Sequence, residues 1–282
     1  MKMKNGFLSI LAVLMTFFLA ACNQHNLPSE PATFGNTEQT IPSQSEQIAP
    51  ETTETEAPET TAPETTAIET VTTAPVHSDL YIPDVSAEDV ILYFNEVCLD
   101  SEYVISGDPR YIQKWTEPIY YTLEGDYTDS DVALLNTFSD WLNSIEGFPG
   151  IFFTQDPVKT NLQICFCGQQ EIPVRMGDEF TNVDGAVRFW YMANEIYDAI
   201  ICYRSDMWPS LRTSVILEEI YNCLGPVQDT KLRPDSIIYQ EYAEPQQLTP
   251  IDELILRLLY HPDIRPGMNA AECEQIIRLL YY

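Results

Sequence analysis

The pattern of apolar and polar residues changes twice along the chain. An apolar run extends from Phe7 to Leu19, large apolar residues are scarce from 23 to about 77, and regularly spaced apolar positions begin after 79. A core of ordinary size needs roughly 100 residues or more, which only the last part offers. The pattern therefore predicts one globular domain over 79–282, preceded by two segments that do not contribute to its core.

Two helices are predicted at the start of this domain. Residues 86–99 place Val90, Phe94 and Val97 behind a Ser-x-x-Asp start, which is typical of a helix N-terminus. Over residues 128–145, apolar side chains recur with a period near 3.6. We expect the second, longer helix to pack behind a sheet.

Several short segments between these helices and the C-terminal third have the pattern of strands. They are rich in β-branched and aromatic residues, and Gly, Pro, Asp and Asn residues that favour turns separate them. The predicted strands are 115–123, 151–154, 162–166, 186–192 and 199–203.

The C-terminal third is predicted to be helical. One helix is expected over 211–224, and Thr249 followed by Pro250 has the residues favoured at the start of another. Asn269 is a suitable N-cap for a last helix over 270–280. With the strands, these helices predict an α+β (α/β-like) fold with a mixed sheet, a long backing helix and a lower, mostly helical part.

Residues 1–22 have the features of a lipoprotein signal peptide. Lys2 and Lys4 precede an apolar run too short for a permanent membrane span, and Leu-Ala-Ala-Cys ends at Cys22 as a lipobox. We expect Cys22 to carry palmitate or similar acyl chains, which contribute about 0.8 kcal/mol per buried methylene to anchoring. The protein would then lie on the extracellular face of a bacterial membrane. The alternative is an ordinary signal peptide with a fortuitous cysteine.

Residues 23–78 are predicted to be a disordered, acidic stalk. Lys and Arg are absent there, and Ala-Pro-Glu-Thr-Thr recurs at Ala49, Ala57 and Ala62. Such a composition buries too little apolar surface to offset the entropy of folding, while proline and like charge keep the chain extended. At about 3.1 Å per residue, the segment could reach on the order of 150 Å. Clustered Thr and Pro also resemble an O-glycosylated stalk.

The domain itself is strongly acidic. The whole chain has a net charge of −29, but nine acidic residues lie in the stalk and two lysines in the signal segment, which leaves about −22 for 79–282. This charge argues against nucleic acid and anionic lipid as partners. It favours solubility and cationic partners, although acidic surfaces without any specific ligand are common.

The cysteines of the domain do not indicate a disulfide framework. Six lie in it, at positions 98, 165, 167, 202, 223 and 273, and an even number permits disulfides in an exported protein. Cys165 and Cys167 alternate with Phe166, so on a strand they would share one face and could not readily bond to each other. We expect small, buried apolar residues at these positions.

Residues 218–229 carry the most informative motif, Glu-Glu-Ile-Tyr-Asn-Cys-Leu-Gly-Pro-Val-Gln-Asp. It resembles the zinc-binding signature of metzincin proteases, HExxHxxGxxHD, with every histidine replaced. In that family two His one helical turn apart and a third after a glycine turn bind zinc. Glu218, Asn222 and Gln228 stand at these three ligand positions, and Glu219 stands at the position of the general base.

Further matches extend this resemblance. Gly225 and Asp229 stand at the turn glycine and at the acid after the third ligand. Residues 236–239 read Ser-Ile-Ile-Tyr where matrixin-like members have Ser-x-Met-Tyr, and 248–252 read Leu-Thr-Pro-Ile-Asp where they have Leu-Thr-x-x-Asp. Ile in place of Met keeps the apolar volume. The predicted order of strands, signature helix, turn and final helix agrees with the metzincin fold.

The chain is also similar to a group of secreted bacterial domains of unknown function. That group carries EExxQxLG and a C-terminal LLYxPxIxPGM, and residues 258–268 here read LLYHPDIRPGM. Asn222 departs from the Gln that the group usually has. The alternative to both resemblances is a plain amphipathic helix that ends in a glycine cap.

The metzincin resemblance implies a peptidase scaffold without its zinc. Zinc prefers imidazole or thiolate, whereas the amide oxygens of Asn222 and Gln228 are better suited to calcium or magnesium. His261 is the one histidine beyond residue 77, and its Tyr-His-Pro-Asp context is typical of a surface turn. We therefore expect no metal and no cofactor, and a hydrogen-bonded cluster of side chains 218, 222 and 228 at the floor of a cleft.

Two functions from different classes are compatible with these features. The leading hypothesis is a cell-surface pseudopeptidase with a binding or structural role, a peptide or protein as its partner, and membrane contact through its lipid anchor. The alternative is an active hydrolase in which carboxylates hold another metal and Glu219 activates water as the general base. A transport-associated solute receptor would share the anchor, but about 200 residues leave little room for two large lobes.

Overall fold

The computed structural model describes residues 16–21, 78–100, 110–241 and 245–281, which all belong to one structural unit. Most of the predicted signal peptide, Cys22 and the stalk to residue 77 lie outside the described residues, so the predictions made for them remain predictions. The predicted domain is described from Ser78 onward.

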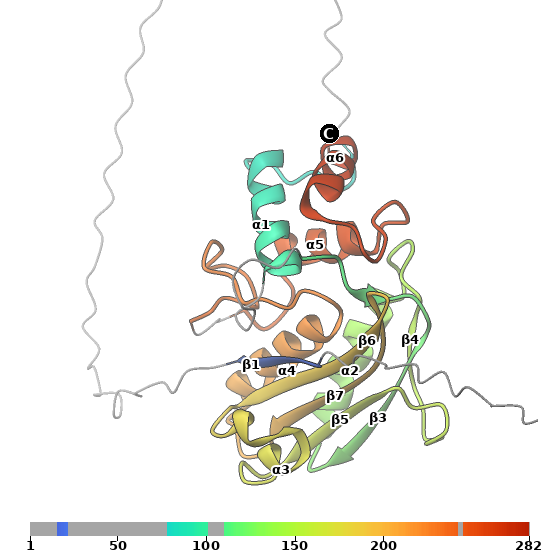
Figure 1. The fold of residues 1–282 in the computed structure, drawn as a ribbon. Coiled ribbons are helices and arrows are strands. Elements are labelled where there is room, and N and C mark those ends of the chain that lie inside the picture. The colour runs from blue at the N-terminus through green and yellow to red at the C-terminus, as the bar shows by residue number, and fades with distance from the viewer. Residues whose placement is uncertain (1–15, 22–77, 101–109, 242–244, 282) are drawn as a thin grey trace, which may run out of the picture. The chain divides into compact units, whose positions relative to one another are not determined.

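A mixed sheet forms the centre of the domain (Figure 1). Its strand order is β1-β6-β7-β5-β3-β4, and β2 pairs with β7 beside this path. The pairs β3–β4, β3–β5, β5–β7 and β2–β7 are parallel, whereas β6 is antiparallel to both β7 and β1. The strands are β1 (Thr16–Ala21), β2 (Lys114–Trp115), β3 (Ile119–Gly125), β4 (Ile151–Phe153), β5 (Leu162–Cys167), β6 (Gly185–Met192) and β7 (Glu195–Arg204).

Six α-helices accompany the sheet in the described part of the chain. Capping boxes begin four of them, at Ser86, Thr128, Thr249 and Asn269. The side chains of Ser86, Thr128 and Asn269 accept from the third helical amide, whereas the amide of Thr249 donates to Asp252. The helices are α1 (Ala87–Leu99), α2 (Asp129–Leu142), α3 (Ile172–Met176), α4 (Pro209–Cys223), α5 (Pro250–Tyr260) and α6 (Ala270–Leu280), with a 3-10 turn η1 at Asp178–Phe180. The α+β fold class is confirmed.

The helices cover the two faces of the sheet unequally. α2 and α4 lie against one face, and α1, α5 and α6 form a helical group beyond one end of the sheet (Figure 1). The side chains of Ile164, Val187 and Ile201 point into a large hydrophobic core, which also contains residues of α2 and α4. Their neighbours Cys165, Ala186 and Cys202 point the other way, into a smaller cluster beneath α3 and η1. The period-2 alternation of strands therefore divides the interior into two cores.

Within the predicted domain, the observed elements differ from the predicted ones at two places. The strand expected over 115–123 is divided, because β2 pairs with β7 while β3 pairs with β4 and β5. Pro118 lies at the break, where a residue without an amide hydrogen cannot join a ladder. The helix α3 was not predicted, since five residues including Pro173 are too short to show helical periodicity.

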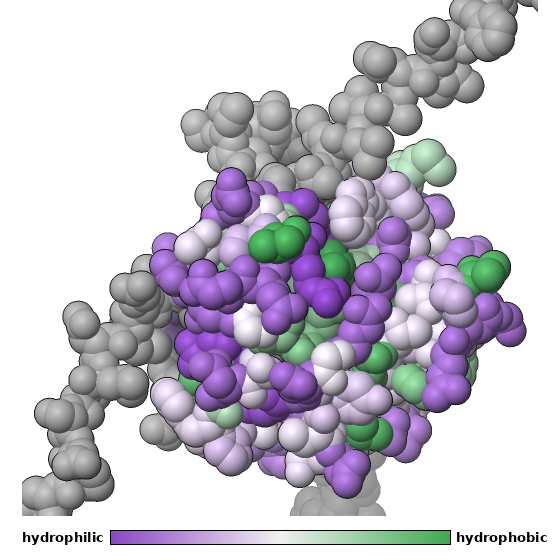
Figure 2. All heavy atoms as spheres, turned by 90° about the horizontal axis from the view of Figure 1, so that it is seen from below, coloured by the Kyte–Doolittle hydropathy of each residue, from purple (hydrophilic) through white to green (hydrophobic). Residues whose placement is uncertain are grey.

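The face of the domain shown in Figure 2 is mainly hydrophilic, with apolar side chains in small separate areas. This agrees with the acidic composition of the domain. Within the described ranges, no helix combines the length and the apolar character needed to span a membrane.

Candidate functional site

Helix α4 carries the motif residues and lies in the interior of the domain. Its buried side chains occur on all sides, from Leu211 to Cys223. Arg212 fixes it against α2, because its guanidinium lies 2.7 Å from Asp131 and also donates to the carbonyl oxygens of Asp126 and Ser205. Both ends of this ion pair are buried. The motif is thus built on a rigid element.

The end of α4 has the geometry that the motif predicts. The helix stops at Cys223, and Gly225 has φ of +127°, a conformation that favours glycine. A Cβ at this position would lie 2.5 Å from the carbonyl oxygen of Gln113. Trp115 Nε1 donates to the Cys223 oxygen (2.9 Å) and Tyr260 Oη to the Leu224 oxygen (2.8 Å), so the last carbonyls of the helix are satisfied.

Glu219 packs against the start of β6. A Cβ built on Gly185, the first residue of β6, would meet Glu219 Cγ at 2.8 Å and Oε1 at 3.0 Å. Glu219 is 0 % exposed, and neither carboxylate oxygen has a hydrogen-bond partner among the described residues. A glycine at 185 is therefore what allows this carboxyl to reach the underside of β6. The sequence alone did not reveal Gly185, because the contact is between distant segments.

Glu218, Asn222, Gln228 and Asp229 form, with Glu219, the buried polar group of the motif, and all four are at most 9 % exposed. Gln228 Nε2 donates to the backbone oxygen of Asp229 (3.2 Å). In the part of the chain that the structure describes, no hydrogen bond joins the side chains of Glu218, Asn222 and Gln228, and Asn222 Oδ1 accepts none. The group is buried as expected, but these three side chains do not bond to one another.

The carboxyls of this group have perturbed acidity. Burial raises the pKa of Glu219 well above its usual range, and the nearby charge of Asp229 adds to the effect. Burial likewise raises the pKa of Glu218, with further contributions from Asp229, Glu219 and Asp184. Both side chains therefore favour their protonated forms relative to an exposed glutamate.

A second polar network holds the turn that follows the motif. Ser236 Oγ donates to Asp252 Oδ1 (2.6 Å) and accepts from Tyr93 Oη (2.8 Å). Asp252 Oδ2 also accepts the backbone amides of Ile237 and Thr249, at 3.2 and 2.9 Å. Asp252 is 0 % exposed. The two downstream segments singled out in the sequence, 236–239 and 248–252, are therefore joined through one carboxylate.

The donor set of the site does not fit zinc. One carboxylate and two amides stand where three imidazoles would be needed, and amide oxygens are poor zinc ligands. Across the described ranges, no three His, Cys, Asp or Glu side chains are placed to hold a metal ion together.

The remaining histidine of the domain lies apart from this site. His261 follows α5 at its C-cap, and its Nδ1 accepts the amide of Asp263 (3.2 Å). This is the surface turn that the sequence indicates.

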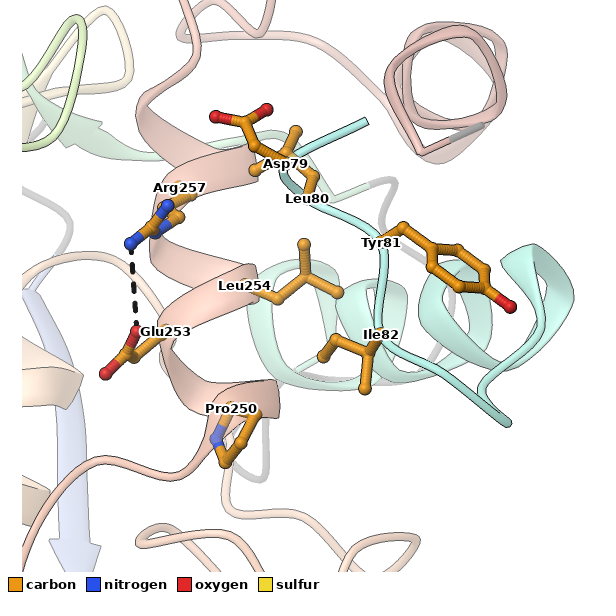
Figure 3. Close-up of a pocket in the computed structure, with 8 residues that line it drawn as sticks. All are labelled: Asp79, Leu80, Tyr81, Ile82, Pro250, Glu253, Leu254 and Arg257. Carbon is orange, nitrogen blue, oxygen red and sulfur yellow. Dashed lines mark ion pairs between the residues drawn. The ribbon is translucent and has the colours of Figure 1, made fainter. Parts of the chain in front are cut away.

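A separate cavity of about 200 Å³ lies where the chain enters the domain (Figure 3). The segment Asp79–Ile82 runs across α5, and Arg257 and Glu253 form an ion pair of 3.8 Å at its rim. The lining residues are Asp79, Leu80, Tyr81, Ile82, Pro250, Glu253, Leu254 and Arg257. None of the motif residues lines this cavity, so it is not part of the site on α4.

Comparison with known proteins gives a family but no described activity. No curated protein matches the chain. Residues 87–279, which run from α1 to α6 and include both polar networks, match the family described as a protein of unknown function (DUF2927). The chain therefore belongs to the DUF2927 family.

Proposed function

We propose that this protein is a lipid-anchored surface protein whose domain is a metzincin-like pseudopeptidase that binds an extended peptide along β6. Acylated Cys22 would hold it on the extracellular face of a bacterial membrane, and the stalk over 23–78 would extend the domain outward. The domain would bind its ligand without cleaving it.

The metzincin-like part of the proposal is supported by elements that lie close together in the structure. The motif helix ends at a glycine with positive φ, and the following turn is tied to Asp252 of the next helix. The mixed sheet has one antiparallel strand, β6, next to that helix. What differs is the donor set, since Glu218, Asn222 and Gln228 replace the histidines.

One observation carries the binding role: an extended segment of this chain pairs with the outer edge of β6. β1 runs antiparallel to β6 with Phe17 opposite Phe189, Leu19 opposite Val187 and Ala21 opposite Gly185. β1 belongs to the predicted signal peptide, whose removal before Cys22 would leave this edge open. An open edge presents unpaired amides and carbonyls that an extended peptide can join.

The alternation of the backbone identifies which groups of β6 face that edge. Arg204 donates its amide to the Asp184 oxygen, so Asp184, and by alternation Ala186 and Arg188, direct their backbone groups toward β7. Gly185, Val187 and Phe189 therefore direct theirs toward β1. These three residues are opposite Ala21, Leu19 and Phe17.

A buried carboxyl lies next to the first residue of β6. Glu219 packs against Gly185, where β6 begins, and its buried oxygens have no hydrogen-bond partner among the described residues. A peptide that pairs as far as Gly185 would end near this carboxyl, which could accept a hydrogen bond from it if the peptide reaches the buried oxygens. A protonated carboxyl can do so without burying an uncompensated charge.

The proposal is tested with a chain that lacks residues 1–22 and a synthetic peptide of residues 14–23 carrying C22S and a lysine tail for solubility. We expect saturable binding by calorimetry. N-methylation at Leu19 should abolish it, because this amide faces β6. N-methylation at Phe18, whose amide faces away, is the matched control and should leave binding intact.

Equal loss of binding with both methylated peptides would show that backbone pairing is not the mode of binding. No binding by the unmodified peptide to a folded chain would remove the proposed function. An apolar surface that only adsorbs peptides would bind all three alike.

One observation also favours the alternative of an active hydrolase: buried carboxyls with raised pKa values are common in catalytic sites. In that case Glu218, Gln228 or Asp229 would hold a divalent metal, with Glu219 as general base. Addition of Ca²⁺, Mg²⁺, Mn²⁺ or Zn²⁺ to the folded chain should then raise its melting temperature and produce peptide cleavage. We expect neither.

The lipid anchor has its own test. Expression of the full chain in a bacterial host supplied with labelled palmitate should label the protein, and C22S should remove both the label and its membrane association. A C98S variant is the matched control, because Cys98 is buried in the core. Labelling that survives in C22S would refute the anchor.

A further inference from the structure

Three cysteines gather in the smaller core, on the face of the sheet away from α4. Cys165 and Cys167 lie on β5, Cys202 lies on β7, and all three are at most 5 % exposed. All are free thiols in this structure. They do not belong to the site on α4, and their chemistry does not depend on the proposed function.

Cys165 and Cys202 are direct neighbours across two hydrogen-bonded strands. In the parallel register of β5 and β7 they lie opposite each other. Neighbouring strands are about 4.8 Å apart, and disulfides join Cα atoms about 4.4 to 6.8 Å apart. Both side chains point into the same small core. The backbone thus already has the spacing that a disulfide needs.

Polar side chains near the surface surround Cys165. Arg175 Nη1 lies 3.4 Å from its sulfur, and the thiol donates to Glu124 Oε2 at 3.8 Å. Arg175 and Glu124 form an ion pair of 3.1 Å, and their side chains are 36 % and 47 % exposed. Movement of this surface ion pair would therefore open a path from solvent to the sulfur.

The two thiols differ in acidity. A hydrogen bond from the Cys202 thiol and the positive charge of Arg175 lower the pKa of Cys165, and they outweigh burial and Glu124, which raise it. The pKa of Cys202 is raised, through its hydrogen bond to Cys165 and through burial. Cys98 and Cys223 differ from Cys165, because burial raises the pKa of both thiols.

We infer that Cys165 and Cys202 are a thiol pair that forms a disulfide by exchange with a small disulfide oxidant. Cys165 is the attacking thiol, Arg175 is its positioning residue, and Cys202 is the resolving thiol. The ligand class of the site is a low-molecular-weight disulfide, which is the co-reactant.

The disulfide between Cys165 and Cys202 forms in two thiol–disulfide exchange steps. The Cys165 thiolate attacks one sulfur of the oxidant, an S–S bond forms between them, and the oxidant's own S–S bond breaks to release one thiolate. The Cys202 thiolate then attacks the Cys165 sulfur and releases the second thiolate. The protons of the two cysteines pass to the leaving thiolates. Two cysteines are oxidised by two electrons, and one disulfide is reduced to two thiols.

The inference is tested on the folded full chain after complete reduction and removal of the reductant. The chain is incubated with oxidised glutathione, quenched with an alkylating agent in denaturant, digested and mapped by mass spectrometry. We expect Cys165 and Cys202 to escape alkylation and to appear as a linked pair of peptides. This readout uses the unmutated chain and does not depend on whether a variant folds.

Variants assign the roles. C202S should stop at a mixed disulfide between glutathione and Cys165, whereas C165S should form neither product. R175Q should slow the first step several-fold, and R175K, which keeps the charge, should react nearly as fast as the unmutated chain. C273S is the control and should still form the link.

Three results would overturn the inference. One is a folded chain that keeps Cys165 and Cys202 alkylatable under strongly oxidising conditions. Another is a link that joins Cys167 to Cys202 instead. The third is a mixed disulfide that accumulates on Cys202 in C165S at the unmutated rate.

Discussion

At the scale of single residues, the site depends on carboxyls that are buried without matching positive charge. Glu219 is completely buried, and its oxygens have no hydrogen-bond partner in the described part of the chain. A buried ionised carboxylate is costly, and a raised pKa is the usual response. This residue should therefore reduce stability at neutral pH, which is expected of a site kept for binding rather than for folding.

The pH dependence of unfolding tests this view of Glu219. Because its pKa is raised in the folded state, its contribution to stability is complete below the unfolded value of about 4.3 and is lost as pH rises through the folded value. We predict that Glu219→Gln is more stable than the unmutated chain at pH 8, with little difference near pH 4. Each pKa unit corresponds to about 1.4 kcal/mol of unfolding free energy.

Denaturant unfolding at several pH values measures this difference. Glu253→Gln is the matched control, because Glu253 lies at the surface of α5. If Glu219→Gln is less stable at every pH, the carboxylate is a stabilising partner and the assignment of its acidity is wrong. The same variant should leave any peptidase activity of the preparation unchanged, because the donor set does not suit the Lewis acid that water activation needs.

Gly225 is predicted to be the most sensitive position outside the apolar core. Its φ of +127° strains any other residue, and a Cβ would contact both the Gln113 carbonyl oxygen and Leu259. Gly225→Val should therefore lower the free energy of unfolding by about 1 to 3 kcal/mol. Pro226→Ala is the neighbouring control and should cost less. Similar losses in both variants would argue against a special backbone conformation at 225.

At the scale of elements, the network around Asp252 connects the turn after the motif to α5. Its carboxylate caps the helix at Thr249 and also accepts from Ser236 and from the amide of Ile237. Burial raises the pKa of Asp252, while these hydrogen bonds oppose the shift. One side chain thus satisfies groups from two segments that would otherwise be buried without partners.

Asp252→Ala should destabilise the domain by about 2 to 4 kcal/mol, since it removes a helix cap and leaves buried donors unpaired. Asp263→Ala, in an exposed turn, is the control and should be nearly neutral. Thermal melting measures both. An unchanged melting temperature for Asp252→Ala would mean that the turn and the helix are held together by apolar packing alone.

The sequence predicted local elements better than the contacts between them. Ser86, Thr249 and Asn269 were recognisable as caps, because each cap acts within three residues of itself. The contact of Gly185 with Glu219 and the pairing of Cys165 with Cys202 depend on strand order, which no local pattern contains. The short helix α3 has too few residues for periodicity.

At the scale of the whole molecule, the segment that enters the domain from Ser78 is tied to its C-terminal end. Ser78 Oγ donates to the backbone oxygen of Tyr281, and Tyr281 Oη donates to the carbonyl oxygens of Ile82 and Val85. The entry segment is therefore fixed to the end of α6. The boundary near 79 that composition indicates remains a prediction.

Two truncations test this boundary. A chain that lacks residues 1–77 should be soluble and melt cooperatively, because the stalk has few apolar residues to contribute to a core. A chain that lacks residues 1–85 should melt at a lower temperature, since it loses these hydrogen bonds and the packing of Tyr81 on Tyr281. If the two melt alike, the segment 78–85 is not part of the domain. If the first does not fold, the stalk is needed.

The central claim is that the outer edge of β6 is open after removal of residues 1–22 and takes up an extended peptide. Amide hydrogen exchange at single-residue resolution measures this directly, in the chain that lacks those residues. We predict fast exchange at Gly185, Val187 and Phe189 without peptide, slow exchange at the same amides with the 14–23 peptide, and slow exchange at Ala186 and Arg188 in both states. Protection of Gly185, Val187 and Phe189 that the peptide does not change would contradict the account.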